Sequence, residues 1–476
     1  MLINKLTSTF GDHSNLIPLF TKDVVNSTGM TAFSYDAGGK IEAKDRFIDE
    51  FGTMAIWMGG LPFFKMAFDK SIYKLAKLSP DVDVRLLKDK EQLNAAQKYA
   101  ETLKNTNVAE TLNEVVKHTK KAQGLFLGKF ATATALTLAS FFTLVKVKQH
   151  YTKKEIEKQF WAKKSAQQQF NSNFAQSPAF KAFAMNGTNA PKADKNVSFK
   201  GLGNTLSSFM FNPVKNLFIV DAGITGERLV ASRTKTEFAE NAIKEGSLLF
   251  FLYIAGSYVQ KGIEKLSEKM GKPIGLHAEV LSSSYMKDSI ESGKVNTDTA
   301  KVKDLIKAVK TAKENNNNNN TTKQLSEAKK ALFEFIYSEK AQENTVVKAA
   351  KHSGTIKTII KGNWFDKLTG KAKNTHKIDP HQFISIGDLE AIADDISKLT
   401  TEAKKHKDLS TFLKKCRNMK IGSVAANMGI TCLFLGLIVP YSMMKYREKH
   451  QNGKKEFHVQ SEIEKQLEQN FKGRMA

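Results

Sequence analysis

The sequence is poor in the residues from which most metal and catalytic sites are built. Its 476 residues contain only two cysteines, Cys416 and Cys432, too few for a disulfide framework or a cysteine-based zinc site. The ten histidines are scattered, and no His-Glu-x-x-His motif occurs. The chain also lacks a Walker phosphate loop and the Gly-x-Ser-x-Gly turn of serine hydrolases. We therefore assign no catalytic residue, no metal site and no cofactor, and a non-enzymatic protein is favoured.

Arginine is also scarce, although the chain is strongly basic. Only seven of its 73 basic residues are arginine, and the formal net charge is +25. The planar guanidinium is the side chain that reads base edges and clamps phosphate, whereas lysine acts as a diffuse point charge. The composition therefore argues against sequence-specific nucleic-acid binding. It favours attraction to anionic lipid headgroups or to an acidic protein partner.

The amino terminus lacks the continuous apolar run of a cleavable signal peptide, so membrane insertion would depend on internal segments. Two of these are long enough to cross a bilayer. Residues 421–444 carry no charge, and residues 124–145 carry only Lys129. As a helix the first of them spans about 36 Å, against a hydrocarbon core of roughly 30 Å. Small residues recur at every fourth position in both, which permits close helix packing, including packing against a second copy of the chain.

Two further apolar runs are weaker candidates. Residues 51–68 contain Lys65 and a Gly59-Gly60-Leu61-Pro62 break, which predicts a kinked, re-entrant or interfacial segment. Residues 246–260 are uncharged but form a run of marginal length for a crossing. A buried core helix is the alternative for both. Basic residues flank every run at both ends, so the orientation in a membrane cannot be read.

The order of features in the first half of the chain recurs in the second half. Residues 45–70 align without gaps with residues 240–265, and Asp-Ala-Gly precedes each, at 36–38 and 221–223. Glu-Ile-Glu-Lys-Gln follows the longer apolar run in each half, at 155–159 and 462–466. We predict an all-α, multi-pass membrane protein with a parallel duplication of a two-segment unit and amphipathic helices outside the membrane. The first repeat would cover 1–166 and the second 205–476, with a loop at 167–204.

The polar stretches between the apolar runs are predicted to be helical. In the first half, residues 89–103 and 108–121 have apolar residues at helical spacing. In the second half, a helical insertion at about 273–405 contains an asparagine run at 315–320, which predicts a hairpin with a flexible tip. An amphipathic helix follows from Ile384, with Ser385 or Gly387 near its start.

The most suggestive local motif is residues 216–229, NLFIVDAGITGERL, which predicts a short apolar strand running into a glycine-containing turn. It resembles the Asp-x-Gly phosphate loop of the sugar-kinase and actin superfamily, with Asp221, Gly223, Thr225 and Gly226 at the matching places. The resemblance implies an aspartate that positions a cation or water and glycines whose backbone amides approach a phosphate.

This resemblance covers about a dozen residues, and the chain departs from the superfamily pattern after them. No β-hairpin and no further phosphate motif follows, and an apolar run stands there instead. The earlier copy, with Asp36 and Gly38, has less strand character before it. The alternative is a turn between helices, in which aspartate caps and glycine permits positive φ.

Taken together, these features favour a membrane-anchored scaffold, tether or assembly factor. Enrichment in lysine, asparagine and isoleucine suggests a bacterial protein, and hence the inner membrane. A channel or transporter built from two parallel repeats is the first alternative, although the apolar runs contain no Asp, Glu or His. A membrane enzyme or nucleotide binder that uses the Asp-Ala-Gly segments is the second.

Overall fold

The computed structural model describes residues 2–11, 16–103, 106–172, 213–314, 319–361, 373–450 and 457–475. These residues are mostly helical, which agrees with the predicted all-α class. They form two compact units, and each unit takes segments from both halves of the sequence. The first unit comprises Met1–Asp23, Trp57–Thr137 and Leu249–Phe434; the second comprises Val24–Ile56, Leu138–Leu248 and Leu435–Ala476.

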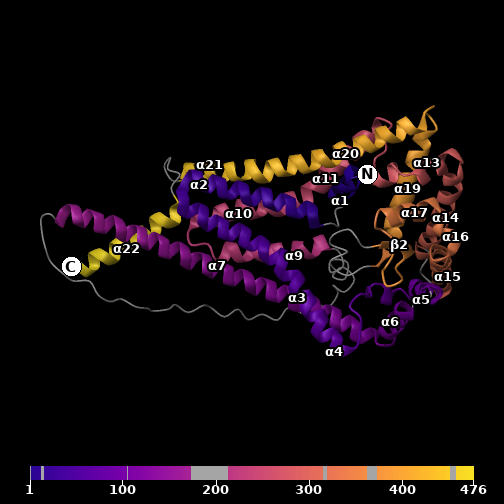
Figure 1. The fold of residues 1–476 in the computed structure, drawn as a ribbon, viewed down its shortest axis with the longest axis horizontal. Helices are drawn as coiled ribbons and strands as arrows, with labels where there is room; N and C mark the ends of the chain where they lie inside the picture. The colour runs from indigo at the N-terminus through magenta and orange to yellow at the C-terminus, as the bar shows by residue number, and fades with distance from the viewer. Residues whose placement is uncertain are drawn as a thin grey trace. The chain divides into compact units, whose positions relative to one another are not determined.

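Long helices carry the apolar runs (Figure 1). They are α2 (Leu16–Ala55) with η1 (Ile56–Gly60), α3 (Leu61–Phe68), η2 (Asp69–Tyr73) and α4 (Lys74–Ala76); α7 (Thr119–Ser172); α10 (Lys235–Leu249) with η4 (Phe250–Ala255) and α11 (Gly256–Lys269); and α20 (Leu409–Leu433) with η5 (Phe434–Ile438) and α21 (Val439–His450). The elements η1, η2, η4 and η5 are π-helical turns. The predicted break at 59–62 is therefore a π-helical turn in a continuing helix. Pro62 follows this turn, at the second residue of α3.

Two helical hairpins dominate the second unit. In α2 the helix is interrupted at Gly39, which has φ 71° and ψ −160°, and the chain reverses there (Figure 1). Only glycine adopts such a conformation without strain. The second hairpin joins α9 (Pro213–Val230) to α10 through residues 231–234.

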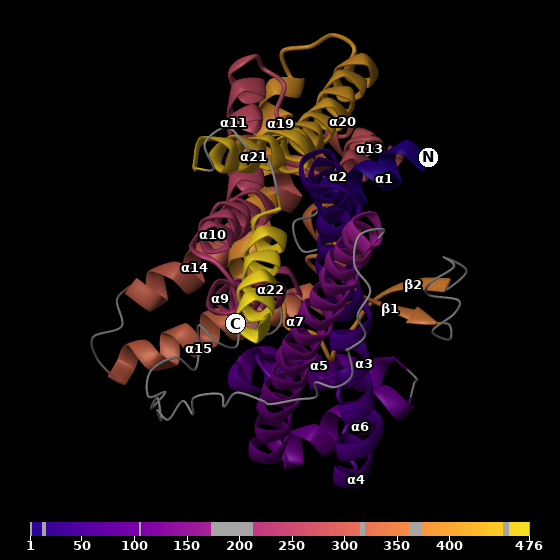
Figure 2. The same cartoon turned by 90° about the vertical axis from the view of Figure 1, so that its left-hand side faces the viewer.

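The carboxyl-terminal helix α22 (His458–Met475) packs beside α7 in this unit (Figures 1 and 2). Trp161 and Phe471 meet edge to face, with ring centroids 5.9 Å apart. Nearer the start of α22, Phe457 and Val459 are buried against Ile41 of α2 and Ile156 of α7. This cluster explains how a largely polar helix is held in place.

The helices α2 and η5 approach each other unusually closely in the second unit. A Cβ atom at Gly29 would lie 2.2 Å from the backbone oxygen of Gly436, and one at Gly436 would lie 2.7 Å from a Val25 methyl group. No side chain fits in this crossing. The two glycines therefore set the distance between the helices.

The first unit contains the shorter helices. They are α1 (Leu2–Gly11), η3 (Leu86–Lys88), α5 (Lys90–Thr102), α6 (Thr106–Lys117), α12 (Ala278–Leu281), α13 (Ser284–Glu291), α14 (Lys294–Glu314), α15 (Asn319–Ile336), α16 (Glu339–Gln342), α17 (Thr345–His352) and α19 (Ile386–Ala403). An antiparallel strand pair, β1 (Thr358–Lys361) and β2 (Lys373–Ile378), was not predicted.

Several of the predicted helices are present. The helices α5 and α6 match the predictions at 89–103 and 108–121, and α14 and α15 form the predicted hairpin. Residues 315–318 at its tip lie outside the described residues. The helix α19 begins after Ser385, whose hydroxyl accepts a hydrogen bond from the Asp388 backbone N–H, as expected for a helix N-cap.

Two local predictions are wrong. Residues 216–229 do not form a strand and turn, because they lie within the helix α9. Residues 167–172 continue α7 instead of starting a loop, and 173–204 lie outside the described residues. In the first case the apolar residues before Asp221 also fit a helix, since short apolar runs do not distinguish the two structures.

Two described stretches are long and apolar enough to cross a membrane, Thr119–Ser165 and Leu409–His450. They contain the two longer apolar runs, 124–145 and 421–444. The runs at 51–68 and 246–260 do not meet this criterion. Length and composition thus support a membrane location through two helices.

The close crossing of α2 and η5 predicts that one methyl group added at Gly29 destabilises the fold. Gly29→Ala should lower the free energy of unfolding by about 1–3 kcal/mol, because the added Cβ overlaps the Gly436 carbonyl. Gly226→Ala in α9 is the matched control, since a Cβ there meets nothing within 4 Å and alanine favours a helix. Thermal unfolding of the purified variants measures both. Equal stability of the two variants would contradict the crossing.

Candidate functional site

The most heavily charged part of the described chain is buried inside the second unit. Seven acidic and six basic side chains pair with one another there: Glu42, Asp45, Arg46, Asp49 and Glu50 from α2, Lys148 from α7, Arg228 from α9, Arg233 from the turn before α10, Glu237, Glu240, Lys244 and Glu245 from α10, and Arg447 from α21. We call this set the ion-pair network. Because its opposite charges nearly balance, its members can stay ionised away from water.

Arg447 lies at one end of the network and is fully buried. Its guanidinium donates to both carboxylate oxygens of Glu42 at 2.7 and 2.8 Å, and to both oxygens of Glu240 at 2.7 and 2.9 Å. Both carboxylates have 0% exposed side chains. Arg46 adds a second cation to Glu240, at 3.2 Å. Arg447 thus joins α2, α10 and α21 through two two-pronged contacts, the geometry in which an arginine–carboxylate pair is strongest.

Arg228 and Lys244 occupy the other end of the network. Arg228 pairs with Glu245 and donates to the Thr53 hydroxyl at 2.7 Å and the Asp49 backbone oxygen at 3.2 Å. Lys244 pairs with Glu50 and contacts Glu245 at 2.8 Å. These contacts join α2 to both helices of the second hairpin.

Asp45 and Lys148 connect the network to α7. The Thr152 hydroxyl of α7 donates to Asp45 at 2.5 Å, and Arg233 contacts the same carboxylate at 3.2 Å. Lys148 lies 3.5 Å from Asp49 and 3.9 Å from Asp45. The network therefore contacts all of the unit's long helices except α22.

The network keeps some of its carboxylates ionised and favours the proton on others. Burial alone would raise the pKa of Asp49, but Arg228, Lys148 and the other nearby cations hold it well below its ordinary value. Burial also opposes ionisation of Glu237, yet its hydrogen bonds from Arg233 lower the pKa to about 2. For Glu42, burial outweighs Arg447 and raises the pKa.

Glu227 lies beside the network without joining it. It is 6% exposed, and neither carboxylate oxygen has a hydrogen-bond partner among the described residues. Burial raises its pKa to about 7, helped by the charges of Asp49 and Glu245 and opposed by Arg228 and Lys148. It is therefore a buried carboxylate that titrates near neutral pH.

The candidate phosphate-loop residues do not form a loop. Asp221, Gly223, Thr225 and Gly226 all lie within α9, where the helix's own hydrogen bonds occupy the backbone amides that would hold a phosphate. A Cβ at Gly223 would lie 2.8 Å from a Leu138 methyl group, so this glycine permits close packing of α9 against α7.

The earlier copy has a different environment. Asp36 is exposed near the end of the first half of α2, and Gly38 precedes the reversal at Gly39. A Cβ at Gly38 would lie 2.0 Å from a Glu42 carboxylate oxygen. Gly38 therefore makes room for a member of the ion-pair network, and this accounts for the glycine without a ligand.

The ion-pair network was not predicted, although the sequence carries a signal for it. Four of the seven arginines, Arg46, Arg228, Arg233 and Arg447, belong to it. In a chain that places lysine nearly everywhere else, arginine marks the positions where two-pronged, permanently charged contacts are needed.

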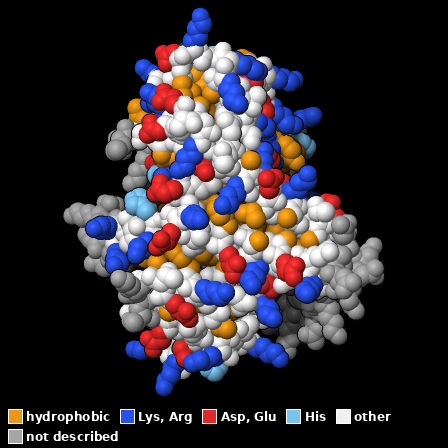
Figure 3. Space-filling view, turned by 90° about the vertical axis from the view of Figure 1, so that its right-hand side faces the viewer, with side chains coloured by type: hydrophobic (Ala, Val, Ile, Leu, Met, Phe, Trp, Pro, Cys, Tyr) orange, Lys and Arg blue, Asp and Glu red, His pale blue; other side chains and the backbone are white. Residues whose placement is uncertain are grey.

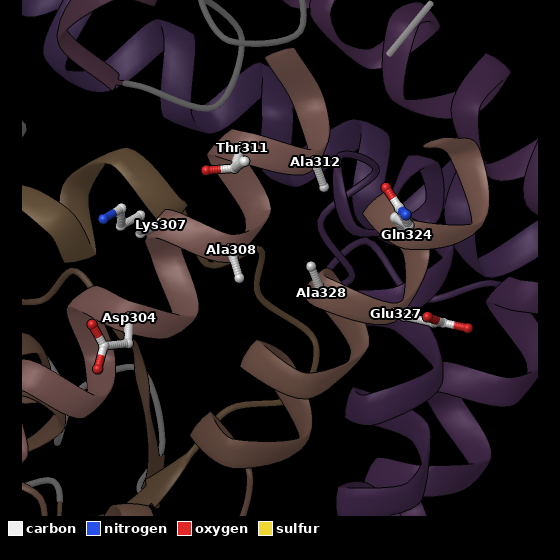
Figure 4. Close-up of a pocket in the computed structure, with 8 residues that line it drawn as sticks. All are labelled: Asp304, Lys307, Ala308, Thr311, Ala312, Gln324, Glu327 and Ala328. Atoms are coloured by element: carbon white, nitrogen blue, oxygen red, sulfur yellow. The ribbon is translucent and has the colours of Figure 1, made fainter. Parts of the chain in front are cut away.

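Two of the open cavities in the first unit have polar linings of interest. One, of about 540 Å³, lies between α14 and α15 and has Ala308, Ala312 and Ala328 on its floor, with Asp304, Lys307, Thr311, Gln324 and Glu327 around it (Figure 4). The second, of about 460 Å³, is lined in part by Tyr285 and His352, whose rings stack with centroids 5.3 Å apart. Lys351 also lines it, and burial lowers the pKa of this lysine to about 8. No group of three potential metal ligands occurs among the described residues.

Comparison with protein-family models, with curated proteins and with solved structures finds no match to this chain.

Removing Arg447, the cation between Glu42 and Glu240, should destabilise the fold strongly. We expect Arg447→Gln to lower the free energy of unfolding by about 3–5 kcal/mol, because two buried carboxylates lose their partner. Arg417→Gln is the control, since the Arg417 guanidinium is exposed and bonds to the neighbouring Asn418; its effect should stay within about 0.5 kcal/mol. Denaturant unfolding measures the difference, and similar losses for both would contradict the role of the network.

The raised pKa of Glu227 predicts that the stability of the fold depends on pH. Its pKa is raised from 4.5 to about 7, so the folded chain binds this proton more tightly than the unfolded chain. Its contribution is therefore fully present below about pH 4.5 and decreases as the pH rises toward 7. We expect Glu227→Gln to unfold at a higher temperature than the parent at pH 8 and at nearly the same temperature at pH 4.5. The exposed Glu101→Gln should show no such difference, and equal pH profiles for both would contradict the assignment.

Proposed function

We propose that the chain is a multi-pass helical membrane protein of non-enzymatic type, and that it acts as a scaffold. In this proposal the apolar runs anchor it in the bilayer, and the short helices of the first unit bind an acidic or mixed-charge protein partner. The observation that carries the membrane part is the exposure of large apolar side chains along all four apolar runs.

Each run leaves such side chains between 40% and 71% exposed: Met58, Phe63 and Met66; Leu127, Leu136 and Phe142; Phe250, Ile254 and Tyr258; Ile430, Leu433, Leu437 and Tyr441. In the two helices long enough to span a membrane, only 22% and 33% of the most apolar window is buried. A core helix of a soluble protein would be mostly buried. Exposed apolar side chains on this scale favour lipid as the surrounding medium.

The position of the ion-pair network along the chain supports four crossings. Glu50 directly precedes the run at 51–68, and Glu245 directly precedes that at 246–260. Lys148 and Arg447 follow the runs at 124–145 and 421–444 by three residues. All four runs thus have one end at the same charged cluster. The first and third begin there and the second and fourth finish there, as expected for two parallel repeats of two segments.

The π-helical turns support the proposed duplication. The gapless alignment of 45–70 with 240–265 carries Ile56–Gly60 onto residues 251–255, and η4 covers Phe250–Ala255. These two turns thus stand at matching positions in the alignment, as a duplication would produce. The same alignment pairs Glu50 with Glu245, and both belong to the ion-pair network.

The face of the first unit around α14 favours a protein partner over a lipid surface. Acidic and basic side chains are interspersed on it, with apolar patches between them (Figure 3). An anionic bilayer would attract a uniformly basic face, whereas mixed charge around an apolar floor is typical of protein-binding surfaces. The cleft between α14 and α15 has this composition.

The scaffold proposal predicts two results for the full-length protein. An alkaline carbonate wash of membranes should leave it in the pellet, because the exposed apolar runs hold it in lipid. After crosslinking in membranes and mild detergent extraction, Ala308→Glu in the cleft should lose a specific crosslinked partner. Ala300→Glu, the same change at an exposed alanine of the same helix outside the cleft, should retain it. Complete release by carbonate, or equal partner capture by the two variants, would contradict the proposal.

A channel or transporter is the second candidate, and a specific observation favours it. Three of the four apolar runs contain a π-helical turn, which disturbs regular helix packing and often occurs at functional sites. Solute flux across vesicles that contain only this protein would favour a channel or transporter over a scaffold.

A further inference from the structure

Lys22 of α2 is a buried cation without a partner. It is 6% exposed, and its ammonium group makes no hydrogen bond or ion pair with any described residue. The ionisable side chain that acts on it electrostatically is the Cys432 thiol, and no described carboxylate does so. A largely buried ammonium without a carboxylate beside it is costly, so an ion or water next to the Lys22 Nζ atom would stabilise the folded state.

Lys22 lies at one end of a polar seam in the first unit, between α2, α11 and α20. A Cβ at Gly256 would lie 3.2 Å from the Lys22 Nζ atom and 3.5 Å from Oδ1 of Asn427, so these two groups flank the same small space. Asn427 is 3% exposed and its Oδ1 has no hydrogen-bond partner. One helical turn earlier, the Ser423 hydroxyl is 2% exposed and also has none.

The other lysine of the seam has a carboxylate partner, in contrast to Lys22. Lys420, 5% exposed, donates to a Glu264 carboxylate oxygen at 2.9 Å. The Gln260 amide donates to the same oxygen at 2.9 Å. The seam therefore provides a carboxylate for one of its two lysines, and that carboxylate is already engaged.

The unpartnered groups can all donate to a negative charge. The Lys22 ammonium has three protons, the Ser423 hydroxyl has one, and the Asn427 amide presents its NH₂ group after a half turn about its side-chain bond. Ser423 and Asn427 are four residues apart on α20 and so share one face of the helix. A single negative charge would balance the single uncompensated positive one.

We propose that Lys22, Asn427 and Ser423 form a binding site for one small monovalent anion, for which chloride is the simplest probe. A side chain at Gly256 would crowd this site, because its Cβ would lie 3.2 Å from the Lys22 Nζ atom. The site does not depend on the scaffold proposal, since it concerns purified protein without a partner.

The test uses full-length protein in detergent and compares sodium chloride with sodium gluconate at equal ionic strength, since gluconate is a much larger anion than chloride. The thermal unfolding midpoint should rise with chloride and then saturate, because the anion binds the folded state. Lys22→Met should abolish this rise, and the exposed Lys265→Met on α11 should retain it. Absence of a chloride effect on the parent, or its persistence in Lys22→Met, would overturn the proposal.

A second variant covers the case in which Lys22→Met does not fold. Gly256→Ala places a methyl group beside the Lys22 Nζ atom and should raise the half-saturating chloride concentration by roughly tenfold, about 1.4 kcal/mol of binding free energy. Gly262→Ala, at a position on α11 where a Cβ meets nothing within 4 Å, should leave it unchanged. An unchanged chloride concentration in Gly256→Ala would place the anion elsewhere.

Discussion

The two-pronged contacts of Arg447 with Glu42 and Glu240 connect segments that are far apart in the sequence, and the second unit depends on them. Three of its helices meet at a guanidinium that has no access to water. A buried pair of this kind adds little net stability, because desolvation offsets much of the attraction. Its main effect is on specificity, since any other register of the helices would leave a buried charge unpaired. The balanced charges around Asp49 and Lys244 extend the same constraint to α9 and α7.

The apolar surface and the charged interior are complementary parts of one arrangement. In a water-soluble bundle the apolar side chains would face inward and the charges outward. Here, the runs expose residues such as Phe63 and Leu437, while Arg447 and Lys244 are fully buried. In the proposed membrane setting, helices gain little from burying apolar side chains against one another, so close glycine contacts and polar pairs would hold them together. The Gly29–Gly436 crossing and the ion-pair network provide both kinds of contact.

Much of the secondary structure could be predicted from the sequence, because each prediction depended on local pattern. The helices α5, α14, α15 and α19 follow apolar spacing and capping residues such as Ser385. The stretch around Asp221 was misread, since four apolar residues before a glycine fit a strand and a helix equally well. The ion-pair network and the environment of Lys22 could not be derived in this way. They depend on which helices meet, and residues as distant as Glu42 and Arg447 carry no local sign of their pairing beyond the scarcity of arginine.

The position of Arg447 near the carboxyl end has a consequence for biosynthesis. Glu42 and Glu240 leave the ribosome long before Arg447, which donates to both of them. Until Arg447 has been made, Arg46 is the one of the two cations described at Glu240 that is present, and Glu42 still lacks its two-pronged contact. Assembly of the second unit is therefore a late event, completed after translation of α21. A chain truncated before α21 would retain its apolar runs up to that point but would lack the cation that closes the bundle.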